Sequence, residues 1–285
     1  MIIDFHTHIF PNKIFSAVIE KLSRTSKTIP FSDGSLSGLL ASMEKSGVNI
    51  SVVLPVATSA AQVEMINKSA ALMNEKFFDR GIISFAAIHP DIDNYRAELS
   101  EIKNLGFQGL KVHPIYQDTR IDDKKYLRIF DRAAELDLIV VTHAGLDIGF
   151  PGVVKCSPQM LKKVLREVGN FKFVLAHMGG WKNWNEVLTN LADEKIFIDT
   201  SFSTGKIFPR TDSVWREEDL KLLDEKKFVE FVKIFGAEKI LFGTDSPWTS
   251  AEMSIKFIKN LSITDAEKNK ILGENAALLL QKNKF

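Results

Sequence analysis

The sequence is poor in features that would by themselves assign a protein class. Its single cysteine, Cys156, excludes an intrachain disulfide and a zinc site built from cysteines. No apolar run approaches the roughly 20 residues of a membrane span, and Asp4 interrupts any signal-like apolar core at the N-terminus. Lys and Arg number 37 against 36 Asp and Glu, and they form no basic stripe. We therefore expect a cytoplasmic protein whose partners are neither nucleic acid nor membrane.

The chain also lacks internal repeats, low-complexity tracts and Pro/Gly/Ser-rich linkers, so residues 1–285 are predicted to form one domain. Eight short apolar runs alternate with segments of helical periodicity, at 2–5, 51–56, 82–88, 109–112, 138–142, 171–176, 196–199 and 239–243. Alternation of this kind is typical of parallel strands covered by helices on both faces. Eight units in 285 residues predict an α/β fold, a single (β/α)8 TIM barrel, with a doubly wound open sheet as the alternative.

Two connections are longer than such a barrel requires. Residues 10–35 follow the first predicted strand and residues 202–222 follow the seventh, and we expect both to be long loops that wall the active site. The segment 264–281 reads as an extra amphipathic helix at the C-terminus, outside the eightfold pattern.

The distribution of histidine is the most informative feature. All six histidines lie at or just past the C-terminal end of a predicted strand: His6, His8, His89, His113, His143 and His177. The C-terminal ends of the strands form the catalytic face of a TIM barrel. Such a placement favours a functional site over six unrelated structural histidines.

The first two histidines are spaced for joint action. Residues two apart in a strand point the same way, so His6 and His8 can reach one metal ion or fill a hydrogen-bonded core. His143 and His177 each end a strand before small residues, which leave room above an imidazole. Asp245 ends the eighth predicted strand, beside the first in a closed barrel, and would add a carboxylate. Together they favour a metal site.

In this order the motifs resemble those of the amidohydrolase superfamily, in the branch that includes aminocarboxymuconate-semialdehyde decarboxylase. They are IIDFHTH (2–8), THAG (142–145), AHMGG (176–180), FGTDSPW (242–248) and ILGENAALLL (271–280). The resemblance implies a divalent metal ion, zinc in most members, held by His6, His8, His143 and Asp245. It also implies that His177 acts in catalysis close to that ion, and Mn²⁺ and Fe²⁺ are the alternative metals.

Three further residues are candidates for binding the substrate. Lys111 and His113 share a face of the fourth predicted strand, and a carboxylated Lys111 would bridge to a second ion, as in some superfamily members. Arg210, in the connection 202–222, would bind a substrate carboxylate, although a solvated surface arginine explains it as well. His89 is interpreted as a structural or rim histidine.

The predicted chemistry follows from the ligand set. A zinc ion with three imidazoles and one carboxylate can lower the pKa of bound water to about 7, and Asp245 can shuttle a proton. We therefore predict a metal-dependent hydrolase that attacks a C–N or C–O bond of a small, carboxylate-bearing or cyclic substrate. A metal-dependent decarboxylase of an aromatic or unsaturated acid uses the same residues and stays open. A non-catalytic metal- or ligand-binding barrel is the third hypothesis, and a homodimer is compatible with all three.

Overall fold

The structure is a computed structural model that describes residues 1–281. The described chain divides into two compact units, each discontinuous in sequence. The first unit consists of residues 1–53, 148–150 and 199 onward, and the second of residues 54–147 and 151–198. Each unit is described by itself.

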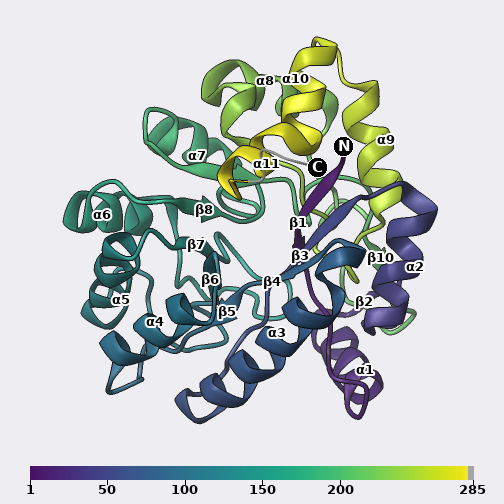
Figure 1. Cartoon of the computed structure of the whole chain (residues 1–285). Helices are drawn as coiled ribbons and strands as arrows, with labels where there is room; N and C mark the ends of the chain where they lie inside the picture. Colours follow the sequence, from purple (N-terminus) through teal and green to yellow (C-terminus); the bar gives the residue numbers. More distant parts are fainter. Residues whose placement is uncertain (282–285) are drawn as a thin grey trace. The chain divides into compact units, whose positions relative to one another are not determined.

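The second unit is built on a parallel sheet whose strands pair in the order β9-β8-β7-β6-β5. These strands are β5 (Ala86–Ala87), β6 (Gly109–Val112), β7 (Ile139–Thr142), β8 (Phe173–Leu175) and β9 (Phe197–Asp199), and β4 (Ile82–Ser84) precedes them. The helices of the unit are α3 (Val63–Phe77), α4 (Tyr95–Asn104), α5 (Lys124–Glu135), α6 (Pro158–Val168) and α7 (Trp184–Leu191). Figure 1 shows α4, α5 and α6 following one another along one side of β6 and β7.

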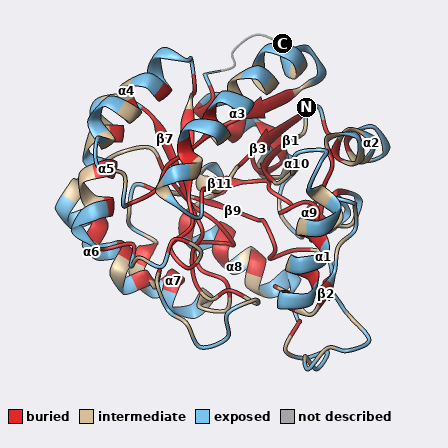
Figure 2. Ribbon diagram, turned by 90° about the horizontal axis from the view of Figure 1, so that it is seen from below, coloured by how far each residue is buried: buried red, intermediate tan, exposed pale blue. Residues whose placement is uncertain are grey.

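Burial explains why these segments form strands and amphipathic helices. Strands β6, β7 and β8 are buried along their whole length, as expected for apolar runs covered on both faces. Each helix has a buried stripe and an exposed face (Figure 2), and α5 buries Tyr126, Ile129, Phe130 and Ala133. Helix α6 begins as its sequence predicts, because Ser157 caps it by accepting from the backbone N–H of Met160 and Pro158 occupies the first turn.

The first unit contains three of the four predicted ligands, His6, His8 and Asp245. Strand β1 (Ile3–Thr7) pairs in parallel with β3 (Ile50–Val53), and β2 (Thr28–Ile29) pairs antiparallel with β10 (Phe208–Pro209). Its remaining elements include β11 (Ile240–Leu241), α1 (Phe15–Ser26), α2 (Leu36–Ser46), α8 (Glu225–Phe235) and α9 (Ala251–Asn260). Both β1 and β3 are fully buried.

All eight predicted strands are present in the described residues, the run 82–88 as the two short strands β4 and β5. The predicted long loop at 10–35 was wrong in one respect, because this connection contains α1 and β2. Apolar residues at helical spacing in FSAVIEKLSRTS give α1 a buried side, which the expectation of a loop overlooked. The connection 202–222 is irregular apart from β10.

The predicted C-terminal helix is confirmed as a nearly continuous helical run. It consists of α10 (Asp265–Asn269), the π-helical turn η4 (Lys270–Glu274) and α11 (Asn275–Leu279). A capping box between Thr264 and Glu267 begins it. Among residues 1–281, no helix combines the length and apolar character needed to cross a membrane.

Candidate metal centre

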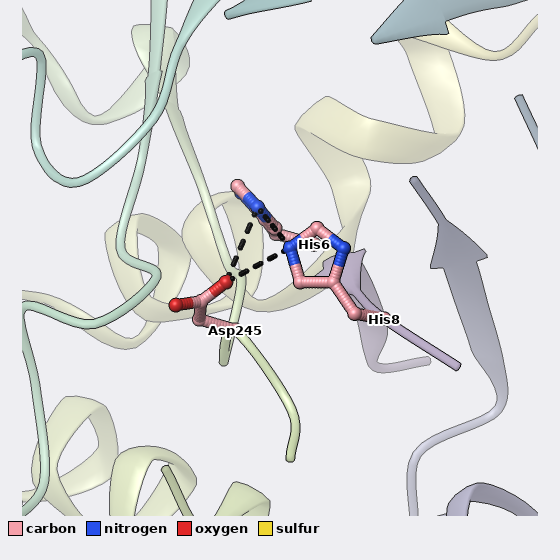
Figure 3. A group of neighbouring side chains, drawn as sticks. All are labelled: His6, His8 and Asp245. Carbon is pink, nitrogen blue, oxygen red and sulfur yellow. Dashed lines mark hydrogen bonds and ion pairs between the residues drawn. The ribbon is translucent and has the colours of Figure 1, made fainter. Parts of the chain in front are cut away.

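Three of the four predicted metal ligands converge in the first unit, as Figure 3 shows. The Nε2 atoms of His6 and His8 are 3.2 Å apart. Oδ1 of Asp245 lies 3.4 Å from Nε2 of His6 and 3.1 Å from Nε2 of His8. Three donor atoms therefore surround one point, with His6 fully buried and His8 and Asp245 slightly exposed.

The strand geometry brings these side chains together. His6 and His8 project from the same face at the end of β1, as their spacing predicts. The backbone N–H of Asp245 donates to the carbonyl of His6 over 2.8 Å, and the N–H of His8 donates to the carbonyl of Ser246 over 2.7 Å. Asp245 adopts a left-handed backbone with φ of 63°, a conformation that aspartate tolerates better than most residues. A side chain at Gly243 would meet Cβ of His6 at 2.9 Å, so a glycine permits this close approach.

A second carboxylate controls the proton of His6. Nδ1 of His6 lies 2.8 Å from Oδ2 of Asp199 and 3.0 Å from Oγ of Ser201. Asp199, the last residue of β9, belongs to the first unit, as His6 does; it is fully buried and also accepts from the hydroxyl and the backbone N–H of Ser201. An ionised carboxylate only accepts hydrogen bonds, so this contact suits the His6 tautomer that has a proton on Nδ1 and a lone pair on Nε2.

These residues fit a divalent cation. Ligand atoms 2.0–2.2 Å from a tetrahedral ion lie about 3.3–3.6 Å from one another, close to the 3.1–3.4 Å found among His6, His8 and Asp245. A histidine that donates its outer N–H to a carboxylate is the usual arrangement around metal ligands. The set of two imidazoles and one carboxylate suits Zn²⁺, Mn²⁺ or Fe²⁺.

Asp4 joins the two strand ends that carry the ligands. Its carboxyl group accepts from the backbone N–H of Thr244 over 2.9 Å and from the Thr244 hydroxyl over 2.6 Å. Complete burial, reinforced by the negative charge of Asp199, raises the pKa of Asp4 to about 7. The folded protein therefore binds the Asp4 proton more tightly than the unfolded chain does.

This raised pKa predicts a pH dependence of stability. Below the unfolded pKa of about 3.9 Asp4 is protonated in both states and imposes no penalty. As pH rises from about 4 to about 7, the unfolded chain releases the Asp4 proton while the folded protein retains it, so the unfolded state is increasingly favoured. Relative to Asp4→Asn, the metal-free wild type should lose up to about 4 kcal/mol of unfolding free energy between pH 4 and pH 8. Urea denaturation of both proteins in chelator tests this, and parallel pH profiles would contradict it.

The fourth predicted ligand, His143, belongs to a second cluster, in the second unit. His143 follows β7, His113 follows β6 and Asp147 lies in the loop after His143. Oδ2 of Asp147 is 3.6 Å from Nε2 of His113 and 3.9 Å from Nε2 of His143. The two imidazole rings stack with centroids 4.2 Å apart. Donor atoms of these three residues lie within 4.8 Å of one another, so spacing alone also allows a cation here.

Hydrogen bonds distinguish the second cluster from the first. The backbone N–H of Tyr116 donates to Nδ1 of His113 over 3.4 Å, which places the proton of neutral His113 on Nε2, facing Asp147. Nε2 of His143 contacts the carbonyl of Leu146 at 3.2 Å, so it also acts as an N–H donor. A donor pair of this kind is suited to an acceptor such as a carboxylate, whereas His6 presents a lone pair.

His177 completes this cluster. Its Nε2 lies 2.9 Å from Nδ1 of His143, and it stands on a turn with positive φ at His177, Met178 and Gly179. Burial lowers the pKa of His143 well below its usual value, and the charges of His113, His177 and Lys111 lower it further. His143 is therefore neutral at pH 7. Lys111 itself is almost completely buried in β6.

A close backbone contact positions the loops that carry His143 and His177. Gly145, with φ of 84°, pairs with Trp181 as a parallel bridge, and the Trp181 N–H donates to the carbonyl of Ala144 over 3.0 Å. A Cβ added to Gly145 would lie 2.2 Å from the backbone nitrogen of Trp181. Only glycine fits between these backbones.

The structure gives the other predicted residues different surroundings. Arg210 lies beside α1, with Nε 3.0 Å from Asp212 and a terminal nitrogen 3.6 Å from Glu20, so its charge is compensated in a surface network. Its role in substrate binding stays a prediction. His89 is buried and accepts from the N–H of Asp91 over 3.2 Å, outside both clusters.

Two residues of these clusters were missed by the sequence analysis. Asp199 ends the predicted strand 196–199, and its position at the C-terminal end of a strand was a sufficient signal. Asp147 follows THAG by two residues in an irregular segment, where no periodicity indicates a direction. That His143 joins His6, His8 and Asp245 around one ion stays a prediction.

Comparison with known families agrees with this geometry. The model of the amidohydrolase family matches residues 3–282, nearly the whole chain. The chain belongs to the amidohydrolase family. The resemblance expected from the IIDFHTH, THAG and FGTDSPW motifs is thereby confirmed. No curated protein matches the chain significantly.

Solved structures show the fold. An uncharacterised TIM-barrel protein from Bordetella bronchiseptica superposes with a TM-score of 0.73 at 16% identity, covering 99% of this chain and 98% of its own. A manganese-bound dihydroxybenzoic acid decarboxylase from Polaromonas gives 0.69 at 16% identity, covering 100% and 98%. A probable 2-pyrone-4,6-dicarboxylic acid hydrolase from Acinetobacter baumannii, with citric acid bound, gives 0.65 at 18%, covering 98% and 99%. This amidohydrolase chain therefore has the predicted TIM-barrel fold.

Proposed function

We propose that this amidohydrolase is a metal-dependent enzyme that removes carbon dioxide from a small aromatic or unsaturated carboxylic acid. The observation that carries the metal dependence is the convergence of His6, His8 and Asp245 on one point, with the His6 lone pair directed there. His143 is proposed as the fourth ligand, as the family resemblance implies, and to bind an ion through Nε2 it would have to give up its N–H bond to the carbonyl of Leu146. A divalent ion held there would act as a Lewis acid that polarises a substrate oxygen.

The charge of the second cluster supports an acidic substrate. Lys111, His113 and His177 are buried groups that can carry positive charge, and their effect on the pKa of His143 reflects their proximity. A substrate carboxylate would add to the compensation that Asp147 gives this cluster, with Lys111 and His113 as its partners. A carboxylated Lys111 that bridges to a second ion stays an open alternative.

Decarboxylation requires a proton for the carbon that loses the carboxyl group. The bond between that carbon and the carboxyl group breaks, its electron pair stays on the carbon, and carbon dioxide leaves. His177 is proposed as the acid that protonates this carbon, because the reference pKa of histidine, about 6.5, suits proton transfer near neutrality. Several similar structures are described as decarboxylases of carboxyvanillate or dihydroxybenzoate, which supports this reaction class.

Hydrolysis of a cyclic ester is the second candidate. The similarity to a probable pyrone dicarboxylic acid hydrolase supports it, and that substrate also bears carboxylates. In this reaction water attacks the ester carbonyl, the C–O bond breaks, and Asp245 or His177 delivers a proton to the leaving oxygen. The same residues serve both reactions, so the products must distinguish them.

Product analysis tests the proposal. Protein supplied with Zn²⁺ or Mn²⁺ should release carbon dioxide from one or more members of a panel of hydroxybenzoic, vanillic and unsaturated dicarboxylic acids. Ring-opened acid from a pyrone or lactone, without carbon dioxide, would instead establish the hydrolase. His177→Ala should retain metal and lower kcat by about 10²–10⁴-fold. Stoichiometric metal with no turnover across both panels would favour a non-catalytic barrel.

A further inference from the structure

We infer that Asp199 is a positioning residue that fixes the tautomer of His6 and thereby makes His6 a metal ligand; this inference rests on the proposed metal dependence. Neither the family match nor the similar structures assign a role to this residue. The inference starts from the 2.8 Å contact between Oδ2 of Asp199 and Nδ1 of His6, both of which are fully buried.

The other oxygen of Asp199 is held separately. Oδ1 accepts the backbone N–H of Ser201 over 3.0 Å and also the Ser201 hydroxyl. These two bonds prevent the carboxylate from rotating and keep Oδ2 directed at His6. Because the Ser201 hydroxyl donates to Asp199, its oxygen is available as a second acceptor for the His6 Nδ1–H at 3.0 Å. Both contacts hold the proton on Nδ1.

The metal-binding nitrogen depends on this proton. A neutral imidazole carries one N–H, so a proton on Nδ1 leaves Nε2 as a lone pair. Nε2 is the atom that lies 3.2 Å from His8 and 3.4 Å from Asp245. If the proton moved to Nε2, His6 would present an N–H to the site where a cation should bind. Asp199 therefore acts on the metal through His6 without needing to touch it.

Replacing Asp199 with asparagine separates shape from charge. Asparagine fills the same volume and can place its oxygen where Oδ1 accepts from Ser201. Its amide nitrogen then faces Nδ1 of His6, donates to it, and drives the proton to Nε2. Ser201→Ala is the matched control, because it removes the hydroxyl while Asp199 remains beside His6.

Competition with a chromophoric chelator measures Zn²⁺ and Mn²⁺ affinity in wild type and both variants. Asp199→Asn should weaken metal binding by roughly 10–100-fold, and Ser201→Ala should weaken it less. Nitrogen-15 spectra of metal-free, histidine-labelled protein should show a protonated Nδ1 for His6 in wild type and a protonated Nε2 in Asp199→Asn. If Asp199 contributed only to structural stability, Asp199→Asn would change neither the metal affinity nor the protonated nitrogen of His6.

The outcomes separate the two proposals. If wild type binds metal and Asp199→Asn binds it equally well, the role of Asp199 is overturned and the metal dependence stands. If wild type binds neither ion, both are overturned. Should Asp199→Asn fail to fold, the wild-type nitrogen-15 spectrum still decides, because a proton on Nε2 of His6 would contradict the inference by itself.

Discussion

Protein carrying His6→Ala should be isolated almost without metal. His6 supplies one of three donor atoms that lie 3.1–3.4 Å apart, and it is the ligand whose lone pair is fixed by a buried carboxylate. Its loss removes a direct bond to the ion, so affinity should fall by more than the roughly 10–100-fold expected for an outer partner. Elemental analysis of protein purified without added metal, followed by chelator competition, measures the change.

His89→Ala is the control for this prediction. His89 is buried and also follows a strand, but it lies outside both clusters and contacts the N–H of Asp91. The control should retain wild-type metal content. Equal metal loss in the two variants would show that general destabilisation, and not ligand removal, explains the effect. His143→Ala extends the comparison. If His143 is the fourth ligand, this variant should lose metal as His6→Ala does, and not retain it as His89→Ala does.

Gly145→Ala should destabilise the protein far more than a methyl group added at an unobstructed glycine such as Gly152. The new Cβ would lie 2.2 Å from the backbone nitrogen of Trp181, and backbone cannot move aside as a flexible side chain can. The positive φ of 84° adds strain of about 1–2 kcal/mol for any residue other than glycine. We expect the free energy of unfolding to fall by more than about 4 kcal/mol, measured as a lower denaturant midpoint.

Gly152→Ala isolates the steric part of this effect. Gly152 has nearly the same φ, 81°, but a Cβ there would meet nothing within 4 Å. This variant should be destabilised only by the backbone strain, which lowers the free energy of unfolding by about 1–2 kcal/mol. If both variants lose the same amount, the contact between Gly145 and Trp181 contributes nothing, and the argument that it positions the loops of His143 and His177 fails.

The eight strands were predictable because their apolar residues are buried on both faces, as β6 and β7 illustrate. The helix α1 was not predicted, because a long connection after the first strand was interpreted by its length and not by its periodicity. The pairing of β2 with β10 could not be predicted from the sequence either, because each strand has only two residues and is too short to show a pattern.

The ligands of the candidate site were also predictable from the sequence, but the hydrogen bonds that set their protonation were not. His6, His8 and Asp245 were expected together because each ends a strand, and the structure brings their donor atoms within hydrogen-bond distance. The proton on His6 was not predictable, since it depends on Asp199, which is 193 residues away. The difference between the two clusters likewise rests on backbone groups of Tyr116 and Leu146, whose positions depend on loop geometry.

The bonds between Asp4 and Thr244 join residues 240 positions apart. During translation His6 and His8 therefore leave the ribosome long before Asp245 does. Until the segment of Asp245 emerges, the two histidines lack their carboxylate partner, and β1 lacks the backbone hydrogen bonds that this segment makes with it. A metal ion bound by this group of ligands would therefore have to wait for the segment of Asp245, and a chain that stops before Asp245 would lack one of the three ligands.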